Sequence, residues 1–352
     1  MKKELLIGTA LVSTLGAASI AEAVTHTISG NHQVGIQFSD PQNGDTTRSQ
    51  KNDNNFSVAL SETTDGGMTI SSSFSIVNEA TATGNVSGDM DAGFSLAFTD
   101  GSKLDVINAG NASGSHDISI PGSAGSEGVT VTTANNAPTG LDFMTAATVY
   151  GVEYHTAADF LADGLSMSFS ASTDDGSTNG SAYTVDGHYA IGATYVTDLG
   201  DTALTLGGGI SASEGSRAHA TAVTNDTGGI HVGLSAVTGD LTVAVGFADG
   251  HKVGVNATSS DEYEGSVTKA GVKYVTGDLT FNVGIASGEG KDNTIGSSGG
   301  SDDSLDVTSA SVSYAVASGV TALLGYTTTE ASNEGAATND GSAWYIGANM
   351  AF

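Results

Sequence analysis

The last nine residues of the chain, WYIGANMAF at positions 344–352, alternate between apolar residues and residues that are small or polar. A period of two residues places every second side chain on the same face of an extended strand. The apolar face of this segment ends on an aromatic ring and comprises Trp344, Ile346, Ala348, Met350 and Phe352. The segment therefore predicts a β-strand with one apolar and one polar face.

The same alternation recurs through the rest of the chain, and no window beyond residue 23 has a sustained helical period. Leu241, Val243, Val245 and Phe247 form one such run, with small or hydroxyl residues between them. The pattern predicts an all-β fold of about sixteen antiparallel strands. They are expected near residues 24–38, 54–62, 67–77, 90–99, 102–108, 147–155, 164–173, 183–197, 202–212, 227–238, 240–250, 266–276, 279–288, 305–317, 319–329 and 341–352.

The connections between these segments alternate in length. Short glycine turns such as Asp100-Gly101 alternate with long connections rich in Gly, Ser, Asn and Asp. The sequence VTGDLT occurs at two of the short turns, at 237–242 and 275–280, which indicates a repeated hairpin unit. An even number of strands with short turns on one side and long loops on the other is typical of an outer-membrane β-barrel.

Aromatic residues distinguish this barrel from a soluble β-sandwich. Amphipathic rings prefer the two membrane interfaces, so a barrel should carry them at both ends of its strands. Several strands end on an aromatic residue just before a short turn, or at the terminus: Phe98, Tyr154, Tyr195, Tyr274, Tyr314 and Phe352. The core of a sandwich would not sort its aromatic residues by strand direction.

The first 23 residues predict a signal peptide. A basic start at Lys2 and Lys3 precedes an apolar stretch over 5–20, and Ala21-Glu22-Ala23 fits the small-x-small cleavage rule. The apolar run is shorter than the roughly 20 residues of a membrane-anchoring helix. We therefore expect cleavage after Ala23 and a single β-barrel domain over residues 24–352.

Charge is strongly one-sided in this chain of 352 residues. Lys and Arg number 10 against 39 Asp and Glu, for a net charge of −29, and there is no Cys. The expected mature chain keeps 8 basic and 37 acidic residues. So few cations exclude nucleic acid as a partner, because that binding depends on Lys and Arg contacts to phosphate.

The terminal aromatic strand, the signal peptide, the sixteen predicted strands and the long third connection together resemble the Gram-negative general-diffusion porins. The resemblance implies a homotrimer of sixteen-stranded barrels in the outer membrane, each with its own water-filled channel for small hydrophilic solutes. It implies that the barrel-assembly machinery recognises Phe352. It also implies that the third loop, about residues 108–146, folds inward and narrows the channel.

Several ionisable residues are candidates for the channel. Within the third loop they are His116, Asp117 and Glu127. On the polar strand faces the candidate wall residues are Lys103, Asp105, Glu153, Asp186, His188, Lys269 and Lys273. The family that this chain resembles places arginines on the wall, but Arg48 and Arg217 fall in expected long loops. Any cationic cluster on the wall would therefore consist of Lys103, Lys269 and Lys273. The alternative is that these lysines lie at strand ends in solvent. The acid surplus predicts a weak preference for cations.

The expected long loops also hold acidic pairs, namely Asp174 with Asp175 and Asp302 with Asp303. Carboxylate oxygens suit Ca²⁺ or Mg²⁺, which could bridge the loops to lipopolysaccharide, although a solvated acidic rim explains the same residues. The residues predict no other cofactor.

Four alternatives compete with this interpretation. A substrate-specific channel would share the architecture, and eighteen strands would result if Ile118-Ile120 and Val129-Val131 formed a further hairpin. A secreted calcium-binding adhesin would need glycine-aspartate repeats, which are absent. A membrane-embedded enzyme would need a Ser/His/Asn or Asp/His set, which cannot be assembled from the sequence, so no catalytic residue is predicted.

Overall fold

The computed structural model describes residues 24–41, 45–79, 86–89, 93–107, 111–122, 150–174, 184–217, 223–255, 260–294, 302–332 and 339–352. The predicted signal peptide, residues 1–23, lies outside these ranges. Within them the chain is built from antiparallel strands and one short 3₁₀ turn, η1 (Gly114–His116). No helix of the described residues is both long enough and apolar enough to cross a membrane.

The strands follow one another around a single sheet. Their bounds are β1 (Thr25–Pro41), β2 (Thr47–Thr63), β3 (Thr69–Glu79), β4 (Val86–Asp89), β5 (Phe94–Ala97), β6 (Lys103–Ile107), β7 (Tyr150–His155), β8 (Leu165–Asp174), β9 (Thr184–Leu199), β10 (Thr202–Arg217), β11 (Val223–Thr238), β12 (Leu241–Val255), β13 (Ser260–Thr276), β14 (Leu279–Thr294), β15 (Asp302–Ala317), β16 (Val320–Ser332) and β17 (Asn339–Ala351). β9 to β15 are each 15 to 17 residues long.

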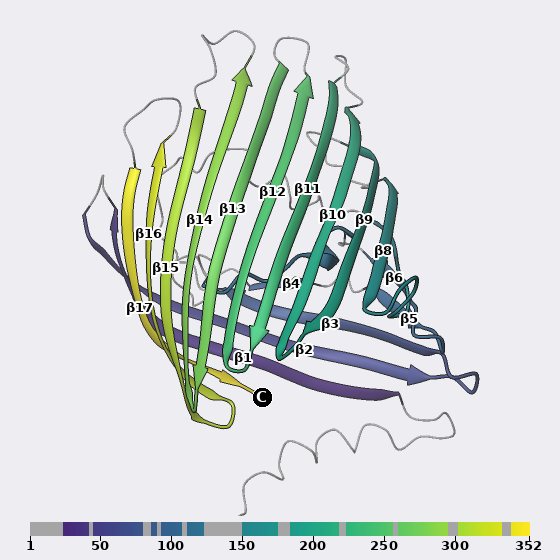
Figure 1. Ribbon diagram of the computed structural model, residues 1–352, viewed down its shortest axis with the longest axis horizontal. Helices are drawn as coiled ribbons and strands as arrows, with labels where there is room; N and C mark the ends of the chain where they lie inside the picture. The colour runs from purple at the N-terminus through teal and green to yellow at the C-terminus, as the bar shows by residue number, and fades with distance from the viewer. Residues whose placement is uncertain are drawn as a thin grey trace, which may run out of the picture.

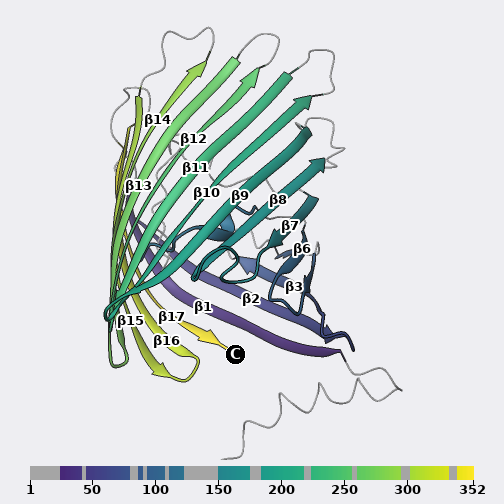
Figure 2. The same cartoon turned by 45° about the vertical axis from the view of Figure 1, so that its right-hand side comes forward.

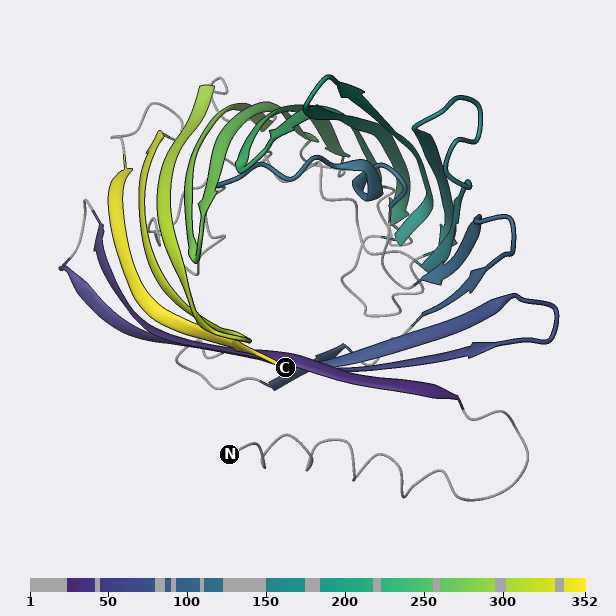
Figure 3. The same ribbon diagram turned by 60° about the horizontal axis from the view of Figure 1, so that its bottom comes forward.

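The sheet closes into a ring. β1 pairs with β2 on one side and with β17 on the other, and apart from β4 and β5 the strands pair with their neighbours in chain order (Figure 3). β4 and β5 both pair with β3, at successive positions along it, so together they make one strand of the wall. The seventeen segments thus form a closed antiparallel barrel of sixteen strands, which confirms the predicted fold class.

β6 and β7 pair with each other directly, from Lys103 opposite His155 to Ile107 opposite Gly151. The long third connection therefore leaves the wall and returns to it between two hydrogen-bonded neighbours. No additional hairpin can enter the ring at this place. The alternative with eighteen strands is wrong.

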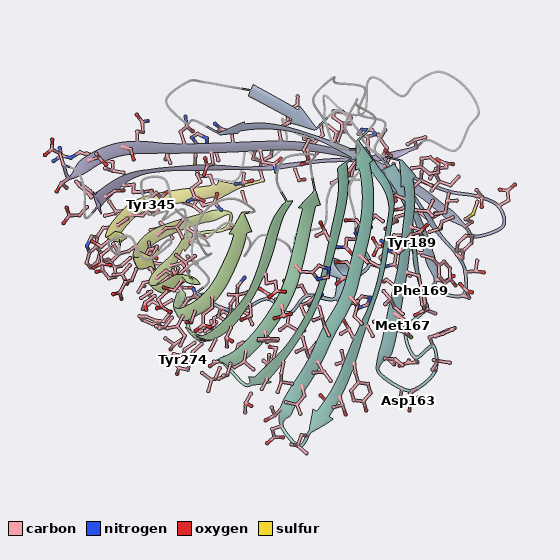
Figure 4. All side chains as sticks on the ribbon, turned by 90° about the horizontal axis from the view of Figure 1, so that it is seen from above. Asp163, Met167, Phe169, Tyr189, Tyr274 and Tyr345 are labelled. Carbon is pink, nitrogen blue, oxygen red and sulfur yellow. The ribbon has the colours of Figure 1, made fainter. Side chains whose placement is uncertain are left out.

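The two faces of the wall differ as the alternation predicts. On β12, Val243, Val245 and Phe247 remain 41%, 46% and 43% exposed on the outside, whereas Ala244 points inward and is 1% exposed. Figure 4 shows such apolar side chains fringing the outside of the barrel. Since a folded protein in water would cover this band, the outside is suited to lipid.

The predicted aromatic residues lie at the edges of this band. Tyr154, Tyr195, Tyr274 and Tyr314 are outward, 39–46% exposed, and close to the short turns. Trp344 lies toward the opposite end, with its ring 4.3 Å from that of Tyr326, and Phe352 closes the chain 69% exposed. The short turns gather at one end of the barrel, as Figures 1 and 2 show for β9 to β16.

The strands extend further into the long connections than the sequence predicts. β2 begins at Thr47 rather than near 54, and β13 begins at Ser260 rather than near 266. Arg48 and Arg217, and the acidic residues 261–264 and 302–306, consequently lie in strands rather than in loops. Backbone ladders need no apolar side chains, so polar strands continue beyond the lipid-facing band.

Candidate channel and its strap

Residues 111–122 of the third connection lie inside the barrel, against the inner wall (Figure 3). We call this segment the strap. Near its start, the Ala112 amide donates to Ser170 Oγ on β8 over 3.0 Å. At its end, the Ser309 hydroxyl on β15 donates to the Gly122 carbonyl. The strap therefore follows the inner wall from β8 to β15, about half of the ring.

The strap turns once, at η1. The His116 amide donates to the Ser113 carbonyl and the Asp117 amide to the Gly114 carbonyl, each over 3.1 Å. The Ser113 amide donates to Asn111 Oδ1 over 3.0 Å, which fixes the start of the turn. This turn directs the His116 side chain to the wall, where it is 7% exposed.

A chain of hydrogen bonds ties His116 to four wall strands. His116 Nδ1 lies 2.7 Å from Thr194 Oγ1, and His116 Nε2 lies 2.8 Å from Ser168 Oγ. Ser168 Oγ is also 2.8 Å from His155 Nδ1. The chain ends in a carboxylate, because His155 Nε2 is 3.0 Å and Lys103 Nζ 2.7 Å from Asp105 Oδ2.

One direction in this chain is fixed by chemistry. The Asp105 carboxylate can only accept, so His155 donates to it from Nε2. Ser168 Oγ joins the two imidazoles, because a hydroxyl group can donate to one ring nitrogen and accept from the other. Burial is the main reason that the pKa of His116 lies below its ordinary value, and the nearby His155 and His231 lower it further.

Asp105, His155 and Ser168 follow the order of a Ser-His-Asp hydrolase. Ser168 is only 1% exposed, however, and its hydroxyl is already hydrogen-bonded to both His116 and His155. A nucleophile must reach a substrate carbonyl, and here the strap occupies that place. The chemical effect of this arrangement is to hold the strap.

Two further contacts join the strap to the wall. The Ser115 hydroxyl donates to Glu153 Oε1 over 2.5 Å, and Glu153 is 3% exposed. His231 Nε2 lies 2.8 Å from the Ser113 carbonyl, which can only accept, so the imidazole donates. The other ring nitrogen, Nδ1, lies 3.7 Å from Asp117 Oδ1.

At the level of the strap, few charged side chains of the described residues face the open lumen. The Asp117 side chain is 73% exposed on the free side of the strap. Lys269 and Lys273 lie on the inward face of β13, since Val272 and Tyr274 between and beside them point outward. Lys103, 41% exposed at its side chain, is paired with Asp105. The described charges at the strap level are therefore mixed in sign.

The structure places the other candidates as follows. His188 is inward on β9 and 2% exposed. Asp186, Asp174, Asp302 and Asp303 belong to β9, β8 and β15, whereas Glu127 and Asp175 lie outside the described residues. Among the residues that the structure describes, no three His, Asp or Glu side chains gather as a metal site.

Sequence reasoning missed Ser168, His155, Thr194 and Ser115, which hold the strap. Only the pairing of β7, β8 and β9 brings Ser168, His155 and Thr194 to His116, which is 78 residues from Thr194 in the chain. No local sequence signal marks these residues, because serine and threonine are common on every polar face of the wall.

A family model described as Gram-negative porin matches residues 8–334. An anion-selective porin from Comamonas acidovorans is similar in structure, with a TM-score of 0.61, 12% identity, and 94% of this chain and all of that chain covered. OmpT of Vibrio cholerae in its trimer form has a TM-score of 0.58 at 13% identity, covering 93% and 100%. A mutant of Rh. blastica porin has a TM-score of 0.55 at 15% identity, covering 93% and 100%. A comparison with curated protein sequences finds no match.

Proposed function

The chain belongs to the family of Gram-negative porins, and from this premise we propose that it is a general-diffusion channel, not an enzyme, for small hydrophilic solutes and ions. As a member of this family it is a multi-pass β-barrel porin of the outer membrane. The observation that supports the proposal is the strap, which lies along the inner wall of a closed sixteen-stranded ring and, within the described residues, occupies one side of it (Figure 3). Barrels of this size leave an aqueous interior.

Single-channel recording in a planar bilayer tests this function. We expect large ohmic steps whose size does not change when sugars or amino acids are added. Block by one solute class would instead assign a substrate-specific channel. A protein that inserts as a folded barrel but gives no steps would contradict both.

The proposed ion preference is weak and for cations. Its support is the surplus of 37 acidic over 8 basic residues in the chain after the predicted leader. At the level of the strap, the positive charges of Lys269 and Lys273 offset the negative charges of Asp117 and the buried Glu153. This balance is why the preference should be small. Reversal potentials in a salt gradient measure it, and a clear preference for anions would overturn the proposal.

A homotrimer is the proposed assembly, and its support is a polar patch on the lipid-facing side. His32 on β1 faces outward, and its Nδ1 contacts Asn54 Oδ1 on β2. Asn54 Nδ2 donates to Asn52 Oδ1 over 3.1 Å. Polar side chains within a membrane are costly unless protein covers them. The trimer form of OmpT, similar in fold, agrees with this reading.

Crosslinking tests the assembly, since the chain has no other cysteine. A His32→Cys variant should give an adduct between subunits, whereas Thr268→Cys, outward on β13, should not. Absence of an adduct at position 32 in a protein that migrates as a trimer would place the interface elsewhere.

The remaining proposals concern the two ends of the barrel. Divalent cations are proposed to bridge the acidic residues beside the long connections, among them Asp174, Asp302 and Asp303 at the ends of β8 and β15, to lipopolysaccharide. Near that rim, Asp306, Glu330 and Asp340 are opposite one another on β15, β16 and β17. A chelator should then weaken lipopolysaccharide binding to wild type.

Phe352 is the proposed contact for the barrel-assembly machinery, and its replacement by Ala should slow assembly.

A further inference from the structure

Glycine residues line the inner wall beneath the strap. Inward glycines on six consecutive strands lie against the strap, and one of them, Gly209 on β10, lies against Ser113. Six others, one on each of β9 to β14, are Gly192, Gly207, Gly233, Gly246, Gly271 and Gly284. We propose that these six glycines, which we call the seat, set the depth of the strap and thereby the width of the channel, with Gly246 the one member that leaves room for a methyl group. The inference rests on the proposed channel function.

The first argument is contact. A Cβ on Gly233 would lie 2.6 Å from the Cβ of Ile118. A Cβ on Gly271 would overlap the Pro121 carbonyl oxygen, and one on Gly284 would lie 2.6 Å from the Gly122 carbonyl carbon. Ordinary carbon contacts are about 3.5 Å or longer, so any side chain at these places must push the strap about 1 Å or more into the lumen.

The second argument is the height of the seat. Gly233 lies five residues before the end of β11, and Gly246 lies five residues after the start of β12. Gly271 and Gly284 stand in the same relation to the turn between β13 and β14, and Gly207 lies five residues into β10. Five of the six seat glycines therefore share one offset from the short turns, whereas Gly192 lies seven residues before the end of β9.

This constancy is not a consequence of strand pairing. Gly207 is opposite Gly233, which is opposite Gly246, but the opposite residue of Gly271 on β12 is Ala244, two positions nearer the short turn. A row of directly paired residues climbs around a barrel because the strands are tilted. Gly271 and Gly284 thus belong to the row of paired residues that begins at Ala244, two residues nearer the short turn than Gly246. This change of row returns the seat to the level of the strap, and Ala244 is 1% exposed.

Glycine's backbone freedom does not explain these positions. None of the six seat glycines has a positive φ, whereas the turn glycines Gly200, Gly239 and Gly277 do. Glycine weakens a strand interior because it has no side chain to pack and loses more entropy on folding. Close approach of another backbone is the remaining reason for a glycine in a strand, and the strap supplies that backbone.

A matched pair of variants on neighbouring strands tests the seat. Gly271→Ala should lower single-channel conductance and the largest polymer size that enters the pore. Gly246→Ala should leave both at the wild-type values, because its Cβ would be 3.4 Å from Ile120 Cδ1, the movable end of a side chain. Gly246→Leu, which is large enough to reach the strap, should lower both.

A double-mutant cycle separates contact from general damage to the wall. Gly233→Ala should lower conductance in the wild-type background but have no effect when Ile118→Gly has removed the opposing Cβ. The seat is wrong if Gly233→Ala and Gly271→Ala form heat-stable barrels that conduct as wild type does. It is also wrong if Gly246→Ala alters conductance as much as Gly271→Ala.

Amide hydrogen exchange tests the seat without measuring conduction and without a variant at the most crowded glycines. If wild type gives no channels, the proposed function fails, but the seat still predicts faster exchange in residues 112–121 for Gly246→Leu than for Gly246→Ala. Equal exchange in the two variants would overturn the seat while leaving the channel function intact.

Discussion

Two regions of the inner wall carry glycines and cover them differently. On β9 to β14 the inward glycines lie against the strap. Across β1 and β17, the paired Gly35 and Gly347 receive the ring of Tyr345, a wall residue that is 0% exposed. The first region is thus filled by a distant segment, and the second by its own strand. In both regions an inward glycine marks a place where another part of the chain lies.

The largest effect is expected where the wall covers itself. Tyr345→Ala removes a fully buried ring over two glycines, so it should lower the free energy of unfolding by about 3–5 kcal/mol. Thermal loss of the folded barrel in detergent, followed by gel mobility, measures the change. Tyr189→Ala, which removes an outward ring that is 59% exposed on β9, should cost clearly less. Equal losses would remove the distinction between the two faces.

The next effect concerns the strap side. Ser168→Ala removes the hydroxyl that hydrogen-bonds both His116 Nε2 and His155 Nδ1, a loss of about 1–3 kcal/mol. Hydrogen exchange of strap amides should accelerate with it. Ser57→Ala, which removes a 2.6 Å contact with Ser75 away from the strap, should leave strap exchange unchanged. Unchanged strap exchange in Ser168→Ala would show that His116 is not an anchor.

A smaller effect is expected from pH. The pKa of His116 is lower in the folded protein than its ordinary value near 6.5, so the unfolded chain binds the proton more readily. Stability from this group is therefore complete above about pH 6.5 and declines as the pH falls below it. The thermal midpoint of wild type should drop more than that of His116→Gln between about pH 7.5 and pH 5. Parallel curves would contradict this assignment.

The smallest effect is electrostatic. Asp117→Asn removes one exposed carboxylate from the strap, so the ratio of cation to anion permeability should fall by about a factor of two at most. Asp163→Asn, at the turn between β7 and β8, should change the reversal potential less. An identical shift in both variants would mean that the strap does not control selectivity.

The fold could be predicted from the sequence because alternation and turn glycines are local signals. The ends of β2 and β13 could not, since their polar continuations look like loop sequence. The strap illustrates the same limit, because Ile118 and Ile120 alternate like a strand but pack on Gly233 and Gly271 instead. Burial of His116 depends on residues 52 and 78 positions away.

The seat did leave a trace in the sequence. The two copies of VTGDLT are each flanked by glycines at one fixed distance, Gly233 with Gly246 and Gly271 with Gly284. Their meaning becomes readable only when the inward face and the level of the strap are known. The roles of Lys269 and Lys273 in conduction stay predictions.

The shared offset of the seat glycines in the two VTGDLT hairpins has a consequence for how such a barrel could grow. Every hairpin of the repeated type brings its own pair of inward glycines, already at the right level. Duplication of one hairpin would widen the wall and lengthen the ledge for the strap in a single event. The channel could then change its circumference without losing the support of its constriction.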